Sequence, residues 1–168
     1  MARELIQNPS FEAGTEHWTF TPGSGPVTNL IVPAHTGTTS GALLSINPAL
    51  TPSILPPPEV SQFIPGPLAP FSLLRLSFYA NFSNPPTEVS ATVTLYAGLI
   101  PLPGIVIHIP PGSNVISFTE YEYYEGYSQP LPPGITGALV KIGISPSTFA
   151  TASIAILVDD ISLTEDVL

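Results

Sequence analysis

The residue types best suited to binding chemistry lie in one short segment, residues 121–127, which reads Tyr-Glu-Tyr-Tyr-Glu-Gly-Tyr. If this segment is a strand, alternation places three of its tyrosines on one face and puts Glu122 and Tyr124 on the other. Aromatic rings beside carboxylates suit hydroxyl-rich ligands such as sugars, tyrosine is also enriched at protein interfaces, and a third interpretation is the half-buried face of an edge strand. The sequence therefore predicts a ligand-binding or interface segment built from Tyr121, Tyr123, Tyr124 and Tyr127.

Residues that could carry catalysis are scattered along the chain. The three histidines stand apart from one another, and the sequence contains neither a His-x-x-x-His pair nor a Gly-x-Ser-x-Gly nucleophile motif. Glu120, Glu122 and Glu125 could imitate the paired carboxylates of a glycosidase. Carboxylates on a tyrosine-rich strand are more simply solvated surface groups, and we therefore expect the protein not to be an enzyme.

The charge balance excludes several kinds of partner. The 168 residues include 12 acidic and only three basic side chains, which gives a formal net charge of −9 at pH 7. Nucleic-acid binding and attraction to anionic membranes both need clustered Lys and Arg, and no run approaches the roughly 18 apolar residues of a membrane span. We therefore expect no nucleic acid as a partner and no membrane insertion. A surface with only 9% charged residues is typical of a protein that assembles or meets neutral ligands.

The elements that must position these residues are strands. The chain has 13 glycines and 22 prolines, and clusters of proline mark loops because proline cannot donate to a sheet ladder. Between the clusters, apolar residues alternate with a period of two, most clearly over Leu73–Phe82 and Val89–Tyr96. The further expected strands cover residues 5–7, 17–21, 27–32, 42–46, 105–109, 115–121, 138–144 and 154–163. With no helical stripe, the sequence predicts an all-β antiparallel jelly-roll β-sandwich, a single domain over residues 1–168.

The core of this sandwich should collect the large apolar residues of the strands. We expect it to contain Phe11, Trp18, Leu44, Leu76, Phe78, Val93, Leu95, Val140, Ile142, Ile156 and Val158.

Five segments, in order, resemble the strands of carbohydrate-binding-module (galactose-binding-like) jelly rolls. Residues 5–12 (Leu-Ile-Gln-Asn-Pro-Ser-Phe-Glu), followed by Trp18, resemble the opening "N-G-x-F-E … W" pattern of that group. Residues 156–163 (Ile-Leu-Val-Asp-Asp-Ile-Ser-Leu) resemble its closing "D-D-V-S-L" strand. The segments between them that are similar to its middle strands are residues 39–44, 60–65 and 76–80. The ordered set spans nearly the whole chain and implies the jelly-roll fold, with Trp18 in the core.

The same resemblance implies a structural calcium ion where the first and last strands meet. The matching positions are Glu12, Asp159 and Asp160, with backbone oxygens near residues 36–41. Calcium takes six to eight oxygen ligands, so carboxylates and carbonyls suit it. Because neighbouring side chains on a strand point to opposite faces, we expect only one aspartate of the pair to face inward with Glu12. The alternative is that both aspartates are solvated at a strand end and make turn hydrogen bonds.

A narrower resemblance is to the N-terminal domains that precede collagen-like repeats in spore-surface proteins of Firmicutes. It is carried by the closing Asp159-Asp160 pair, the Pro/Gly-rich middle, the single lysine and the lack of an apolar secretory signal at the N-terminus. The resemblance implies a non-catalytic structural domain at a bacterial cell or spore surface, reached without a classical signal peptide. The chain departs from that pattern because it contains no Gly-X-Y repeat.

Self-assembly is the main hypothesis for function. Two apolar stretches, residues 54–58 and 100–107, are long for exposed loops, and their prolines would prevent uncontrolled pairing of strand edges. We therefore expect a homo-oligomer or fibre, with other surface-layer proteins or glycans as further partners. The alternative is a calcium-stabilised carbohydrate-binding module that uses the tyrosine-rich strand. The chain contains no cysteine, so disulfides and thiolate chemistry play no part.

Overall fold

The chain folds into two antiparallel sheets. The computed structural model describes residues 2–28, 33–45, 57–82, 88–110, 120–144 and 154–167, and these ranges contain strands but no helix. The strands are β1 (Ala2–Glu4), β2 (Thr19–Phe20), β3 (Gly25–Thr28), β4 (Thr39–Ser45), β5 (Glu59–Pro65), β6 (Leu73–Phe82), β7 (Val89–Ala97), β8 (Ile100–Ile109), β9 (Glu122–Tyr127), β10 (Gly137–Ile144) and β11 (Ile154–Asp166). The predicted all-β sandwich is therefore confirmed.

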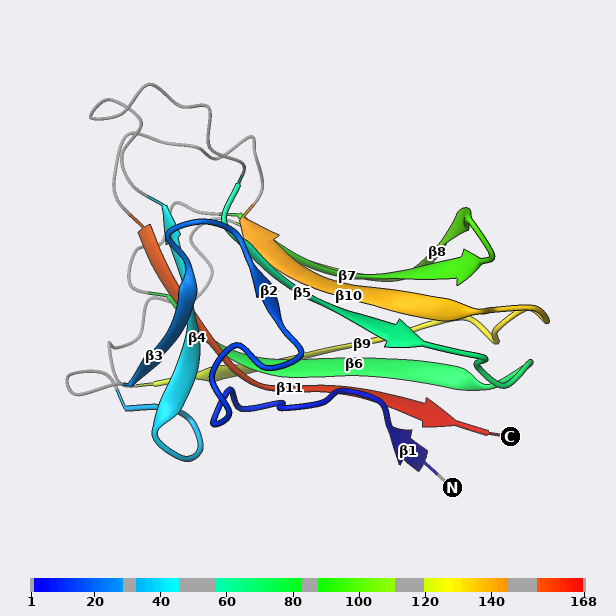
Figure 1. The fold of residues 1–168 in the computed structure, drawn as a ribbon, viewed down its shortest axis with the longest axis horizontal. Coiled ribbons are helices and arrows are strands. Elements are labelled where there is room, and N and C mark those ends of the chain that lie inside the picture. Colours follow the sequence, from blue (N-terminus) through cyan, green and yellow to red (C-terminus); the bar gives the residue numbers. More distant parts are fainter. Residues whose placement is uncertain are drawn as a thin grey trace.

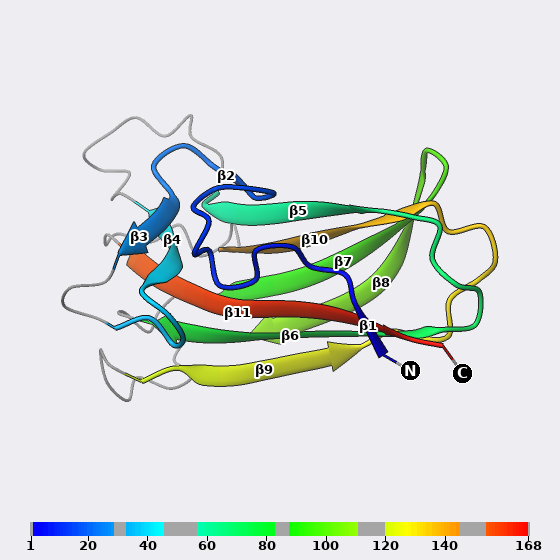
Figure 2. The ribbon, with the colours of Figure 1, turned by 60° about the horizontal axis from the view of Figure 1, so that its bottom comes forward.

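The two sheets stack face to face (Figures 1 and 2). Sheet A has the order β3-β4-β11-β6-β9, with β1 paired to β11 at the end where both termini lie (Figure 1). Sheet B has the order β2-β5-β10-β7-β8. Strands β9 and β8 are therefore edge strands on corresponding sides of the sandwich, and each sheet has one face in the core and one facing solvent.

The core lies between the sheets and follows the period-two patterns. On β6, Leu74, Leu76, Phe78 and Ala80 are fully buried, while Arg75 on the other face is exposed. Ten of the eleven predicted core residues are buried. The prediction for Leu44 is wrong: it is 40% exposed, and its neighbour Leu43 is in the core instead. Leu43 pairs directly with the core residue Ile156, so alternation turns Leu44 outward.

The stretch predicted to be an apolar loop, residues 100–107, is instead part of strand β8. Pro101 and Pro103 are tolerated there because β8 is the edge of sheet B and one side of its backbone pairs with nothing in the sheet. Gly104 lies at a register shift opposite Val93 and Thr94, and a Cβ atom there would approach the Val93 carbonyl oxygen to 2.5 Å. Glycine at this bulge therefore lets the strand continue past its prolines.

Other boundaries differ from the expected ones. The first strand is Ala2–Glu4 rather than residues 5–7. Strand β5 (Glu59–Pro65) is not among the strands that the alternation predicts, but it coincides with the segment 60–65 that resembles a middle strand of the jelly roll. Strand β9 starts at Glu122, and most of the expected strand 115–121 lies outside the described residues, as do residues 54–56 of the other apolar stretch. None of the described segments is a helix long and apolar enough to cross a membrane.

Candidate ligand-binding faces

The predicted tyrosine segment forms β9, the edge strand of sheet A. Tyr123 and Tyr127 point to solvent and are 44% and 59% exposed. Tyr124 points the other way and stacks on Phe78 at a ring-centroid distance of 5.5 Å, while its hydroxyl donates to Glu122 at 2.7 Å. The expected alternation is confirmed within β9, where Tyr123 and Tyr127 are exposed and Tyr124 faces inward.

The exposed tyrosines are part of a larger group on the outer face of sheet A, which we call the aromatic face. Pairing of β9 with β6 sets Tyr123 beside Tyr79 and Tyr127 beside Arg75. Tyr79 lies between two rings: His35 stacks on it at 3.6 Å and 15°, and Tyr123 tilts against it at 5.2 Å and 54°. The aromatic face consists of His35, Arg75, Tyr79, Tyr123, Glu125 and Tyr127.

Polar contacts fix the orientation of Tyr123. Its hydroxyl accepts a hydrogen bond from Arg75 Nη2 at 3.3 Å and donates one to Glu125 Oε2 at 2.9 Å. Arg75 Nε also lies 3.8 Å from Glu125 Oε2. Charges of opposite sign therefore accompany the exposed rings.

The fourth predicted tyrosine, Tyr121, lies just before β9 and supports this face from the side. It is half-buried, its hydroxyl lies 3.0 Å from Ser40 Oγ, and its ring meets His35 edge-on at 5.7 Å. Burial is the main cause that raises the pKa of Tyr121. Tyr121 therefore positions His35 rather than presenting a ring to solvent.

The closing aspartates hold the loop that carries His35. Asp159 pairs with Tyr79 on the outer face of sheet A and is fully buried beneath residues 35–36. Its Oδ2 accepts hydrogen bonds from the backbone N–H groups of His35 at 2.8 Å and Thr36 at 3.1 Å. Burial, the largest cause, raises the pKa of Asp159 to about 6, although these bonds favour the charged form.

Asp160 reaches the same loop because β11 bulges there. Its φ is 48°, and the register with β6 shifts between Asp159 and Ser162. As a result both aspartates face the loop: Asp160 lies 2.6 Å from His35 Nδ1 and accepts from the Thr36 hydroxyl at 2.5 Å. The expectation that one aspartate would face inward with Glu12 is wrong, because the bulge overrides simple alternation.

Glu12 holds the next residues of this loop. Its Oε1 accepts from the backbone N–H groups of Thr38 and Thr39, both at 2.8 Å, and its Oε2 accepts from the Thr38 hydroxyl at 3.0 Å. The Thr38 N–H bond is the main cause that lowers the pKa of Glu12. Asn8 fixes the preceding turn by accepting from the backbone N–H of Ala13 at 3.0 Å, so the opening motif places this carboxylate.

The three predicted calcium ligands, Glu12, Asp159 and Asp160, therefore act on one stretch of chain, residues 35–39. They do so as acceptors of N–H and O–H hydrogen bonds. Within the ranges that the structure describes, no three acidic, His or Cys side chains are grouped so that they could hold a metal ion. Hydrogen bonds to the loop occupy oxygens of all three carboxylates, and calcium stays a prediction.

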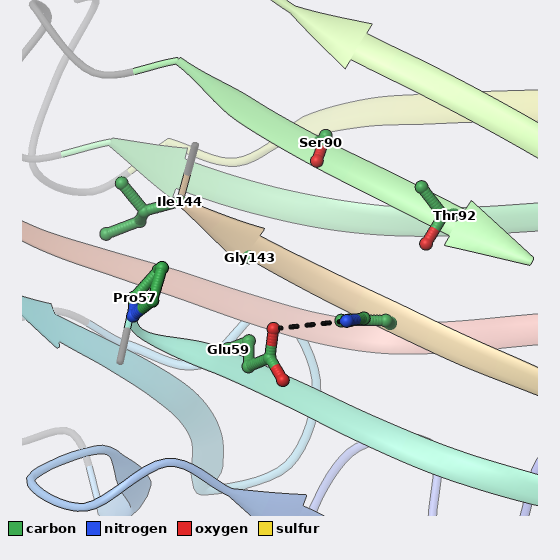
Figure 3. Close-up of a pocket in the computed structure, with 7 residues that line it drawn as sticks. Pro57, Glu59, Ser90, Thr92, Gly143 and Ile144 are labelled. Carbon is green, nitrogen blue, oxygen red and sulfur yellow. Dashed lines mark ion pairs between the residues drawn. The ribbon is translucent and has the colours of Figure 1, made fainter. Parts of the chain in front are cut away.

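The outer face of sheet B carries a hollow of about 370 Å³, which we call the groove (Figure 3). Glu59 Oε2 and Lys141 Nζ lie 3.4 Å apart in it, with side chains that are 37% and 42% exposed. Gly143 forms the bottom of the groove, where a side chain would not fit, because a Cβ atom there would lie 2.9 Å from the Glu59 Cβ. The lining residues are Pro57, Glu59, Ser90, Thr92, Lys141, Gly143 and Ile144.

The same face ends in an aromatic pair. Phe63 is 57% exposed and meets Tyr96 in an edge-on contact at 6.1 Å. Both flank Gly137, which pairs with Tyr96, and a Cβ atom on it would come within 2.7 Å of the Phe63 ring. Alternation places Phe63 on the same side of β5 as Glu59. The groove face therefore runs from a polar end at Glu59 and Lys141 to an aromatic end at Phe63 and Tyr96.

Sequence reasoning missed the groove face, although signals for it were present. The alternation of Val89–Tyr96 leaves Ser90, Thr92 and Tyr96 on one face, and Lys141, one of only three basic residues, lies within an apolar strand. What the sequence does not show is the pairing of β5 and β7 with β10, which brings Glu59 and Ser90 to either side of Gly143.

Comparison with known proteins supports the fold. No protein-family model matches the chain, and no curated protein does. A CBM61 module solved with β-1,4-galactotriose is 16% identical, with a TM-score of 0.62 over 96% of this chain and 97% of the module. The xylan-binding CBM22-1 domain of Paenibacillus barcinonensis Xyn10C is 15% identical, with a TM-score of 0.64 over 99% and 97%. A cyclase from Fischerella sp. TAU is 14% identical, with a TM-score of 0.63 over 99% and 98%.

These likenesses confirm the carbohydrate-binding-module-like jelly roll that the ordered motifs predicted. At such low identity they show the fold alone. They give no support to the narrower resemblance to collagen-like spore-surface proteins, which stays a prediction.

Proposed function

We propose that the protein is a non-catalytic carbohydrate-binding module whose groove face binds a neutral polysaccharide. The observation that carries this proposal is the alignment of the polar groove with the Phe63–Tyr96 pair on one solvent-facing side of sheet B. Aromatic rings provide apolar platforms for the C–H faces of sugars, and nearby polar groups fix the orientation of a ligand.

The polar end of the groove face offers both hydrogen-bond donors and hydrogen-bond acceptors for sugar hydroxyls. The Glu59 carboxylate accepts, the Lys141 ammonium donates, and the hydroxyls of Ser90 and Thr92 do either. Glu59 and Lys141 balance one another's charge, so the groove favours a neutral chain over a uronate polymer. Because the residues lie on adjacent paired strands, their spacing is set by the sheet before a ligand arrives.

Two of the structural neighbours guide the choice of ligands. The CBM61 module was solved with β-1,4-galactotriose, and the CBM22-1 domain is a xylan-binding domain. Xylan and β-1,4-galactan are therefore the first polysaccharides to test. Both are neutral in their backbone, as the balanced charges of the groove require.

The test is affinity electrophoresis in gels that contain each polysaccharide. We expect Phe63→Ala to weaken binding at least tenfold, because exposed aromatic anchors dominate interface energetics. Leu99→Ser is the matched control: Leu99 is 97% exposed at the β7–β8 hairpin and lies outside both faces. If the polysaccharide retards Phe63→Ala as strongly as it retards the wild type, the role of the groove face is overturned.

Absence of catalysis is part of the proposal. A cyclase is among the proteins that share the fold, so the fold alone does not decide the matter. The support is the lack of a histidine or nucleophile motif in the sequence. Release of reducing ends from xylan or β-1,4-galactan by the purified chain would contradict it.

Structural calcium is retained as a proposal that rests on the opening and closing motifs. Its test is the melting temperature in calcium and in excess chelator, for the wild type and for Glu12→Gln. A calcium-dependent rise that disappears in Glu12→Gln would support the ion. Equal melting temperatures in both buffers would show that hydrogen bonds alone hold residues 35–39.

Self-assembly at a bacterial or spore surface is the second candidate function. The observation in its favour is a set of exposed apolar side chains on β8 and its hairpin: Leu99, Ile100 and Val106. An edge strand with such residues offers a contact for a second copy. Light scattering decides: a trimer or larger species that Ile100→Glu dissociates would support assembly, and a monomer of 17.7 kDa would reject it.

A further inference from the structure

The two sheets stack face to face, so their outer faces point in opposite directions (Figure 2). Each outer face carries exposed aromatic rings. The groove face accounts for the rings of sheet B. The aromatic face of sheet A has no role in the proposed function, although Tyr123 and Tyr127 are among the more exposed large side chains of the described residues.

The aromatic face is preorganised. Tyr79 is fixed between His35 and Tyr123, and the Tyr123 hydroxyl is fixed between Arg75 and Glu125. Tyr79 and Tyr123 therefore have little side-chain freedom left to lose when a ligand binds, and such loss is a main cost of association. A surface with a purely structural role has no need for rings that are held rigidly and left open to water.

The charges of the face identify the class of ligand. Arg75 and Glu125 provide one cation and one anion, 3.8 Å apart, so their charges offset each other beside the exposed Tyr123 and Tyr127. Together they provide guanidinium donors and carboxylate acceptors beside flat rings, which is the complement of a sugar: hydroxyls at the edge and C–H groups on the face. A protein partner would need a larger apolar area than two exposed tyrosines offer.

We propose that the aromatic face is a second carbohydrate-binding site, for a neutral polysaccharide, and that one chain can therefore join two polysaccharide segments. Tyr123 and Tyr127 provide the stacking surface, and Arg75 and Glu125 the hydrogen bonds. The site does not depend on the groove face, because the two lie on opposite sheets. Two sites on one rigid body bind a polymer with higher avidity than either site alone and cross-link separate chains.

The experiment is a titration of the ¹⁵N-labelled full chain with xylotriose and β-1,4-galactotriose, followed through backbone amide shifts. We expect two separate groups of shifts for at least one probe, one at Ser90, Thr92 and Gly143 and one at residues 122–127. Shifts at the groove alone would overturn the second site and leave the proposed function standing. Shifts at residues 122–127 alone would support the second site and remove the groove. No shifts with either probe would overturn both.

Variants separate stacking from structure. Tyr123→Ala should weaken the second site at least tenfold, whereas Tyr123→Phe, which keeps the ring and loses the hydroxyl, should weaken it only a few-fold. Phe63→Ala should leave the second site unchanged. In a turbidity assay with soluble xylan and β-1,4-galactan, the wild type should cross-link the polymer and each alanine variant should not. Equal affinity of Tyr123→Ala and wild type at residues 122–127 would overturn the proposal.

Discussion

The groove face and the aromatic face are built by different means. Apart from Pro57, the groove face takes its residues from β5, β10 and β7, three strands paired side by side, so the sheet ladder fixes their spacing. The aromatic face takes its residues from β6, β9 and the loop at residues 35–36. That loop is held by Asp159, Asp160 and Glu12, from distant parts of the chain. Backbone pairing therefore supports the groove face. The side chains of Glu12, Asp159 and Asp160, which we call the clamp, support the aromatic face.

This difference determines which substitutions disrupt each face. Substitutions remote from the groove face should leave it intact as long as sheet B forms. The aromatic face should respond to changes in the clamp, because His35 stacks on Tyr79 only while its loop is held. Variants in the clamp therefore separate the two faces without touching a ligand-facing residue of either.

The largest effect should come from Asp159→Ala. This change removes the buried acceptor of the part-buried hydrogen bonds from the His35 and Thr36 N–H groups, and a donor left unsatisfied costs up to roughly 1–3 kcal/mol when water cannot replace the acceptor. We expect the free energy of unfolding to fall by that amount in a urea titration, and binding at the aromatic face to weaken while binding at the groove face persists. Asp160→Asn is the control and should cost less, because the Asp160 carboxylate is less buried and asparagine tolerates the φ of 48° at this position. Equal loss of binding at both faces would contradict the separation.

A smaller effect is expected from Gly37→Ala. Gly37 has φ +64°, and a Cβ atom there would lie 2.4 Å from Glu12 Oε1, so alanine must displace the Glu12 carboxylate. Gly14→Ala is the matched control, because Gly14 has φ +65° and nothing within 4 Å of its Cβ position. Both variants bear the cost of a left-handed backbone, roughly 1–2 kcal/mol. We expect the melting temperature of Gly37→Ala to be lower than that of Gly14→Ala. Equal melting temperatures would show that the Glu12 carboxylate does not help to hold the loop.

The sequence predicted local features well and long-range ones poorly. The period of two identified β6 residue by residue and sorted Tyr123 and Tyr127 from Tyr124, because alternation is a property of one strand. The ordered motifs predicted the jelly roll. They also predicted that Glu12 and Asp159 lie near each other, and in the structure both hold the loop at residues 35–39. Where a bulge inserts one extra residue, as at Asp160 and Gly104, alternation no longer predicts which face of the sheet a side chain occupies.

The groove face could not be predicted because it exists only after pairing. Glu59, Ser90 and Lys141 are far apart in the chain, and each alone reads as an ordinary surface residue. Their proximity depends on the strand order β5-β10-β7, which joins segments separated by tens of residues. His35 is a similar case, because its stacking on Tyr79 follows from the clamp and from no local pattern.

The pH dependence of stability should isolate Asp159. Its pKa is about 6 in the folded protein and near 3.8 when unfolded, so the folded state binds the proton more tightly. The contribution of this group to stability is complete below pH 3.8 and is lost as the pH rises through 6. We expect the unfolding free energy of the wild type minus that of Asp159→Asn to decrease between pH 4 and 6.5. A constant difference across this range would show that the Asp159 pKa is not raised.

The smallest effect on stability should come from Glu59→Gln in the groove. Its ion pair with Lys141 is partly exposed, and such pairs contribute about 0–1 kcal/mol, so the melting temperature should hardly move. The change leaves Lys141 unbalanced, and we expect new, salt-sensitive binding of an anionic polymer such as polygalacturonate at the groove face. Glu125→Gln should do the same at the aromatic face by unbalancing Arg75. If neither variant gains anionic binding, charge balance is not what restricts these faces to neutral chains.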